Sequence, residues 1–126
     1  MRDEDRKNRL RVAVYMRVAT KEQTEDACLA MERQEALLEK LVEGCGNTVA
    51  GRFRDYASGI RYDRPGLSAA LEAVNSGRAD ALLVKDYARL GRDAFLTEEI
   101  VRRLRDKGKR VFFADALVQG GMIDKM

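Results

Sequence analysis

Four stretches of the chain show the short apolar or alternating pattern of β-strands. The first alternates and is rich in β-branched residues, with the sequence Leu10-Arg-Val-Ala-Val-Tyr-Met-Arg-Val18. The third is a continuous apolar run whose length suits a central strand of a parallel sheet, which is buried on both faces. The predicted strands are 10–18, 48–54, 80–85 and 111–114.

Between these strands, apolar residues recur at helical spacing. Thr24 and Asp93 stand where N-cap residues are favoured, and Pro65 stands at a first helical position. Glycines follow each predicted helix and end it. The predicted helices are 25–43, 65–74 and about 94–107.

Strand and helix alternate three times along the chain. Because parallel neighbours need crossover connections, this order predicts an α/β fold. We expect one three-layer domain with a mostly parallel, four- to five-stranded sheet flanked by helices. The predicted boundaries are a charged N-terminal extension at 1–9, the domain at 10–119 and a tail at 120–126. Ligands of such sheets bind at the carboxyl ends of the strands, in the loops after Val18, Arg54 and Lys85.

Composition adds limits. The chain has 126 residues, enough for one core, and 45% hydrophobic and 36% charged residues favour an ordered globular protein. Two cysteines, Cys28 and Cys45, with no histidine predict neither a zinc site nor a disulfide framework, so we expect reduced thiols. No segment suits a secretion signal or a membrane span, which predicts a cytoplasmic protein without a membrane partner.

The basic residues are mostly arginine, 17 of 24, although the net charge is only +3. Arginine suits bidentate contacts with phosphate. The three strand-end loops would bring four arginines together, which is costly unless an anion neutralises them. Pairing with nearby carboxylates or with carbonyls at helix ends is the alternative. The four residues are Arg17, Arg64, Arg89 and Arg92.

The same loops carry three motifs in a fixed order. Together they resemble the catalytic domain of serine-type site-specific DNA recombinases, the resolvase and invertase family, over about residues 10–115. The motifs are Tyr15-Met-Arg17-Val-Ala19-Thr20 with Gln23; Asp55 with Ser58-Gly59 and Arg64-Pro65-Gly66-Leu67; and Arg89-Leu90-Gly91-Arg92.

The resemblance implies a reaction in which a serine hydroxyl attacks a DNA phosphodiester, forms a covalent intermediate and religates without metal, nucleotide or other cofactor. It implies that the four arginines grip the scissile phosphate. Gln23 and Asp55 would orient that cluster, and Ser58 and Gly59 would shape the loop that carries Arg64.

Two positions depart from the family pattern. Ala19 stands where the family has its nucleophilic serine, and a methyl group cannot attack phosphorus, so the chain is predicted not to cut DNA. The hydroxyl of Thr20 is displaced by one residue, to the opposite side of an extended chain, which disfavours it as a substitute. Ala88 stands where many members have aspartate, and Asp86 is the candidate to replace it. An engineered change and a natural loss both explain Ala19; Ala88 favours the second.

Active relatives continue into a long dimerisation helix and a DNA-binding domain that have no match here. DNA binding is therefore expected to be weak and salt-dependent, and a homodimer or tetramer is expected only in a longer context. Two alternatives are open. One is a non-catalytic module that binds DNA or recombinase subunits and regulates them. The other is an unrelated phosphate-binding α/β protein, which the lack of Gly-x-Gly-x-x-Gly and Walker lysine motifs disfavours.

Overall fold

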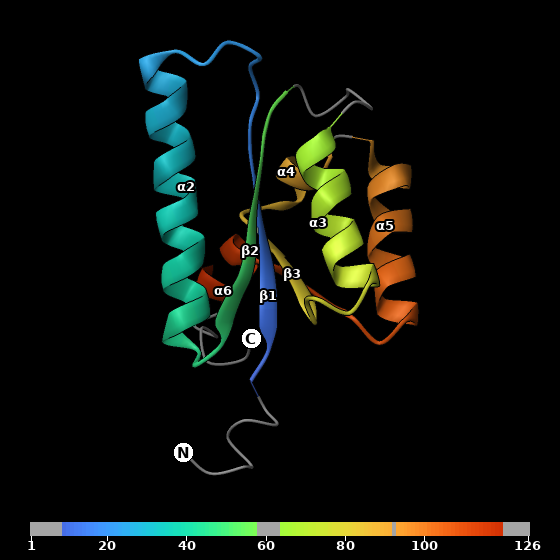
Figure 1. Cartoon of the computed structure of the whole chain (residues 1–126). Coiled ribbons are helices and arrows are strands. Elements are labelled where there is room, and N and C mark those ends of the chain that lie inside the picture. Colours follow the sequence, from blue (N-terminus) through green and yellow to red (C-terminus); the bar gives the residue numbers. More distant parts are fainter. Residues whose placement is uncertain (1–8, 58–63, 92, 120–126) are drawn as a thin grey trace.

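The computed structural model describes residues 9–57, 64–91 and 93–119 (Figure 1). Its strands form one parallel sheet in the order β2-β1-β3-β4, which confirms the predicted α/β fold. Residues 1–8 of the predicted extension at 1–9 lie outside the described residues, as do the predicted tail at 120–126 and the predicted site residues Ser58, Gly59 and Arg92. The elements are β1 (Arg11–Val18), α2 (Glu25–Gly44), β2 (Thr48–Tyr56), α3 (Pro65–Asn75), β3 (Ala81–Val84), α4 (Tyr87–Leu90), α5 (Ala94–Asp106), β4 (Arg110–Phe113) and α6 (Ala114–Gln119).

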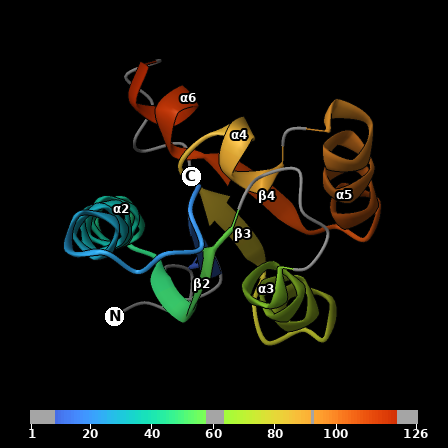
Figure 2. The ribbon, with the colours of Figure 1, turned by 90° about the horizontal axis from the view of Figure 1, so that it is seen from above.

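The central strand β1 divides the core in two. Val12, Val14 and Met16 pack on one face with residues of α2, and Leu117 of α6 packs against the same cluster. Ala13 and Tyr15 pack on the other face with residues of α3 and α5. Figure 2 shows this three-layer arrangement, with α2 and α6 on one side of the sheet and α3 and α5 on the other. The alternation of side chains along one strand therefore sets both layers.

The predicted helix starts are confirmed. The Thr24 side chain accepts a hydrogen bond from the Ala27 amide at 3.1 Å, Asp93 accepts one from the Leu96 amide at 3.1 Å, and Pro65 opens α3. Each cap satisfies a backbone N–H that has no partner inside the helix.

Two short helices were not predicted. Asp86 caps the single turn α4, which is too short to show a periodic pattern. Ala114, predicted as the last residue of a strand, instead begins α6, because the Asp115 amide bonds the Lys85 carbonyl at 2.9 Å and turns the chain. Strand β2 runs two residues beyond the predicted end and pairs Val18 with Tyr56.

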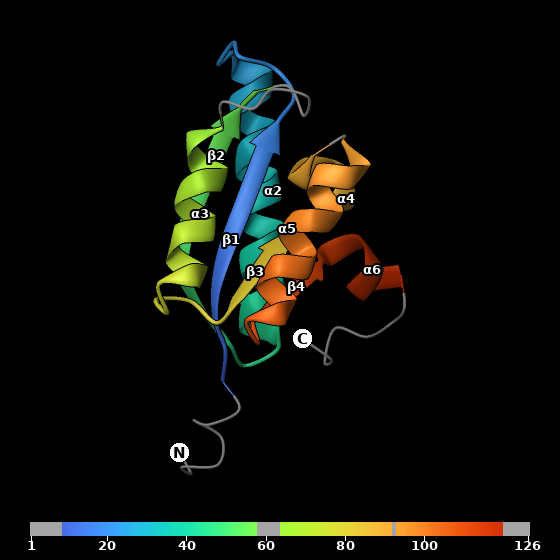
Figure 3. The ribbon, with the colours of Figure 1, turned by 90° about the vertical axis from the view of Figure 1, so that its right-hand side faces the viewer.

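The carboxyl ends of the strands meet at one edge of the molecule. Figure 3 shows the end of β1 and the starts of α2, α3 and α4 at this edge. No helix in the described part of the chain is long and apolar enough to cross a membrane. The predicted site residues that the structure describes lie in the last residues of β1 and β2 and in the loops and first helical turns at this edge.

Candidate functional site

Arg17, near the end of β1, ties the three loops together. Its guanidinium donates to the carbonyls of Ala57 at 2.7 Å, Ala88 at 2.6 Å and Arg89 at 3.1 Å. Only 2% of the residue is exposed. A buried guanidinium is tolerated when its donors are satisfied, and here backbone oxygens satisfy them. Arg17 was expected to grip a phosphate; here three backbone carbonyls accept from its guanidinium, and the residue also lines the cleft described below.

Gln34 of α2 fixes the backbone of the same residue. Its amide oxygen accepts from the Arg17 N–H at 3.0 Å, and its amide nitrogen donates to the Arg17 carbonyl at 3.2 Å. The sequence interpretation missed Gln34. The available signal was a polar residue between Met31 and Leu38 on the buried stripe of the helix. A buried amide at such a position needs partners, and the end of β1 supplies them.

Asp55, near the end of β2, anchors the first turn of α3. Its carboxylate accepts hydrogen bonds from the Tyr15 hydroxyl at 2.7 Å, the Gly66 amide at 2.8 Å and the Leu67 amide at 2.9 Å. Burial, and then the bond to Asp55, raise the pKa of Tyr15, which keeps that phenol protonated as a donor. Arg64 directly precedes α3, so the bonds from Asp55 to the Gly66 and Leu67 amides fix the helix start next to it.

Arg64 and Arg89 have N–H groups without acceptors. The Nη1 of Arg64 donates to the Leu90 carbonyl at 2.6 Å. The Nη1 of Arg89 lies 3.5 Å from Oδ2 of Asp86, and the other carboxylate oxygen of Asp86 accepts from the Arg89 backbone amide at 2.9 Å. Within the described ranges, the Nε atoms of both arginines are buried without a hydrogen-bond partner. Asp86 therefore holds Arg89 and the start of α4, whereas each guanidinium retains an unused donor.

A cleft of about 420 Å³ opens beside Ala19, between α2 and the ends of β1 and β3. Ala19 itself is exposed. Four of the lining side chains are basic, which makes the cleft suitable for an anion. The lining residues are Arg17, Val18, Ala19, Ala30, Arg33, Gln34, Leu37, Lys85 and Arg89. Among the four basic residues that line the cleft, Arg33 and Lys85 were not predicted as site residues.

Gln23 and Thr20 lie in the exposed connection between β1 and α2. In the described chain only the backbone carbonyl of Gln23 has a contact, from the Cys28 thiol at 3.8 Å, so the expected orienting role has no contact to support it. The Thr20 hydroxyl accepts the Glu22 amide at 3.2 Å and stabilises a local turn. No group of three or more potential metal-ligating residues occurs among the described residues.

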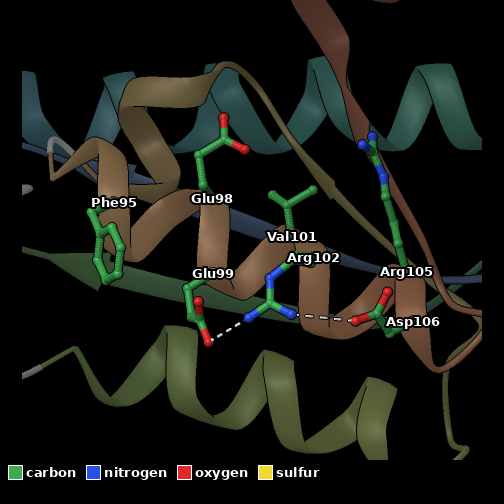
Figure 4. Close-up of a pocket in the computed structure, with 7 residues that line it drawn as sticks. All are labelled: Phe95, Glu98, Glu99, Val101, Arg102, Arg105 and Asp106. Carbon is green, nitrogen blue, oxygen red and sulfur yellow. Dashed lines mark hydrogen bonds and ion pairs between the residues drawn. The ribbon is translucent and has the colours of Figure 1, made fainter.

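A second hollow, of about 480 Å³, runs along the outer face of α5 (Figure 4). Arg102 pairs within it with Glu99 at 2.9 Å and with Asp106 at 3.6 Å. Its lining comes from one helix and its charges largely compensate each other, so it offers no concentrated charge for a ligand. The cleft beside Ala19 is therefore the better candidate site.

Known proteins resemble this chain over most of its length. Residues 12–125 match the family model of the resolvase N-terminal domain. The chain is 33% identical over 105 residues to a resolvase from Escherichia coli, covering 82% of this chain and 44% of that protein. It is 36% identical over 94 residues to the serine recombinase gin from Escherichia phage Mu, covering 75% and 42%. The chain thus spans less than half the length of these relatives.

The fold is also similar to solved structures. The catalytic domain of ISC1926 TnpA, an IS607-like serine recombinase, matches with a TM-score of 0.73 and 26% identity, covering 82% of this chain and 67% of that one.

Proposed function

Because this chain belongs to the resolvase N-terminal domain family, the catalytic domains of serine recombinases, we propose that it binds the DNA backbone without cleaving it. One observation carries the proposal: Arg17 joins the three strand-end loops, Arg64 donates to the Leu90 carbonyl of α4, and Arg89 of the same helix lines the cleft beside Ala19. Arg64 and Arg89 both have buried N–H groups without acceptors. A phosphate oxygen is the acceptor that the family relationship favours.

The arginines have two different roles, one structural and one in binding the phosphate. Arg17 holds the loops in place through carbonyl contacts and is not itself available to a ligand without giving up those bonds. A buried donor without a partner costs about 1–3 kcal/mol, so a phosphate that accepts from Arg64 and Arg89 recovers part of that cost on binding. Their charges also neutralise the phosphate, which gives affinity without base readout.

Ala19 removes the nucleophile from this arrangement. Its methyl group has no oxygen that could form a phosphoester. The nearest hydroxyl along the chain, that of Thr20, is engaged with the Glu22 amide. We therefore expect phosphate binding to persist while strand cleavage is lost.

Binding to a duplex oligonucleotide of about 20 base pairs, followed by fluorescence anisotropy over a range of salt concentrations, tests the phosphate site. Arg64→Gln and Arg89→Gln should each weaken binding about fivefold and reduce the log–log salt slope by about 1. Arg78→Gln is the matched control, because Arg78 is 65% exposed and precedes β3 at the opposite edge of the sheet. Equal effects of all three changes, or none, would refute the site.

A chimaera tests the role of Ala19. The chain would replace the matching region of the phage Mu recombinase, with Ala19 or with Ala19→Ser, and covalent protein–DNA adducts would be sought on denaturing gels. We expect an adduct only with serine. An adduct with alanine would show that another group attacks, and none with serine would show that Ala19 is not what prevents cleavage.

A further inference from the structure

The cleft beside Ala19 is lined by both apolar and basic side chains. Val18 and Ala19 from the end of β1, with Ala30 and Leu37 from α2, supply the apolar part. Arg33 of α2, Lys85 after β3 and Arg89 of α4 supply the positive charge. The volume of about 420 Å³ is far larger than one phosphate group needs and falls in the range of sites that hold a whole small molecule.

The positive charge of the cleft is only partly compensated. Arg33 is exposed and has no ion pair or hydrogen bond with any residue that the structure describes. The positions one helical turn from Arg33 carry no carboxylate, because they are Leu29, Ala30, Ala36 and Leu37. Two glutamates of the helix pair instead with β2, Glu35 with Arg54 and Glu39 with Arg52. The arrangement of α2 therefore leaves Arg33 without a carboxylate partner at the cleft.

Among the described residues, Lys85 has only long contacts with carboxylates. Its ammonium lies 3.7 Å from Asp86 and 4.0 Å from Asp115. At such distances and partial exposure, ion pairs contribute little and are readily exchanged. Asp86 is also shared with Arg89. These two carboxylates therefore do not fully neutralise the three cations that face the cleft.

We propose that Arg33 and Lys85 form a second phosphate subsite, which binds the phosphate next along the strand from the one held by Arg64 and Arg89. The subsite rests on the proposed function, since it assumes that DNA backbone occupies the site. Arg89 belongs to both parts and makes them adjacent. The apolar side chains that line the cleft can pack against the carbon atoms of the deoxyribose between the two phosphates.

Two thymidine oligonucleotides separate the subsites: dT2 has one phosphodiester and dT3 has two. Titrations of the whole chain, followed by two-dimensional NMR, would give both affinities and show in the same spectra that each variant is folded. The parent should bind dT3 about fivefold more tightly than dT2. Arg33→Gln and Lys85→Gln should each reduce this ratio, and the double variant should abolish it. Arg105→Gln is the control, because Arg105 is exposed on α5 and has no ion pair among the described residues.

The outcomes distinguish the two proposals. A ratio that survives in the double variant overturns the second subsite and leaves the first intact. Affinity for dT2 that is unchanged in Arg64→Gln and Arg89→Gln, or absent in the parent, overturns the proposed function instead. A ratio that falls equally in Arg105→Gln shows a general charge effect and also refutes the subsite.

Discussion

Asp55 is the residue whose removal should most disturb the site. Its carboxylate accepts from Tyr15, Gly66 and Leu67 at 2.7–2.9 Å, and only 5% of the residue is exposed. In Asp55→Ala two buried donors, the Tyr15 hydroxyl and the Leu67 amide, and the partly buried Gly66 amide lose their acceptor. Each lost bond costs about 1–1.5 kcal/mol when water partly replaces the acceptor and more when it does not, so we expect a total loss of about 3–5 kcal/mol. The start of α3, and with it Arg64, should lose its fixed position.

Urea unfolding followed by circular dichroism measures this loss. The control is Asp106→Ala, which removes a carboxylate that is 67% exposed and should change the unfolding free energy by less than about 0.5 kcal/mol. If Asp55→Ala is too unstable to measure, Tyr15→Phe removes one of the three bonds and should cost about 1–1.5 kcal/mol. A loss below about 1 kcal/mol in Asp55→Ala would refute the anchoring role.

Three further predictions concern stability. A Cβ at Gly66 would lie 2.3 Å from a backbone carbonyl oxygen of β2, so Gly66→Ala should cost about 3 kcal/mol in urea unfolding, whereas Gly44→Ala, which meets nothing within 4 Å, should be neutral or slightly stabilising. Thr24→Ala should cost about 1 kcal/mol by the same assay, because α2 loses its cap. Hydrogen bonding to Arg11 lowers the pKa of Asp80, so this pair should stabilise the fold above the ordinary carboxyl pKa of about 4 and lose that effect as pH falls further; Asp80→Asn should flatten the acid limb of a plot of unfolding free energy against pH.

Much of the fold could be predicted because its strands and caps depend on local chemistry. Val12 to Met16 show the alternation that separates two packed faces, and Thr24 and Asp93 act as caps through bonds within their own turns. The start of α6 could not be predicted from local sequence patterns. It depends on the bond from the Asp115 amide to the Lys85 carbonyl, thirty residues back along the chain, which no local pattern contains.

The site shows the same division. The meeting of the loops could be predicted, because parallel strands end at one edge of the sheet. The direction of the Arg17 side chain could not, since it depends on carbonyls supplied by two other loops. Arg33 was also missed, because on a sequence its charge looks like any solvated helix position. The fold shows that no carboxylate among the described residues pairs with it, and that Glu35 and Glu39 of the same helix pair with β2.

These differences decide which arginines argue for a ligand. The position of Arg17 is explained by folding alone, because three backbone carbonyls accept hydrogen bonds from its buried guanidinium and offset the cost of burying the charge. By contrast, no hydrogen bond offsets the burial of the Arg89 Nε, and no carboxylate among the described residues pairs with the Arg33 guanidinium. The positive charge at the cleft is only partly compensated, because Lys85 and Arg89 share Asp86, and this is unfavourable until an anion enters. The phosphate proposal therefore depends on the arginines whose charge the fold leaves partly uncompensated, and Ala19 bears only on the separate proposal that the bound strand is not cut.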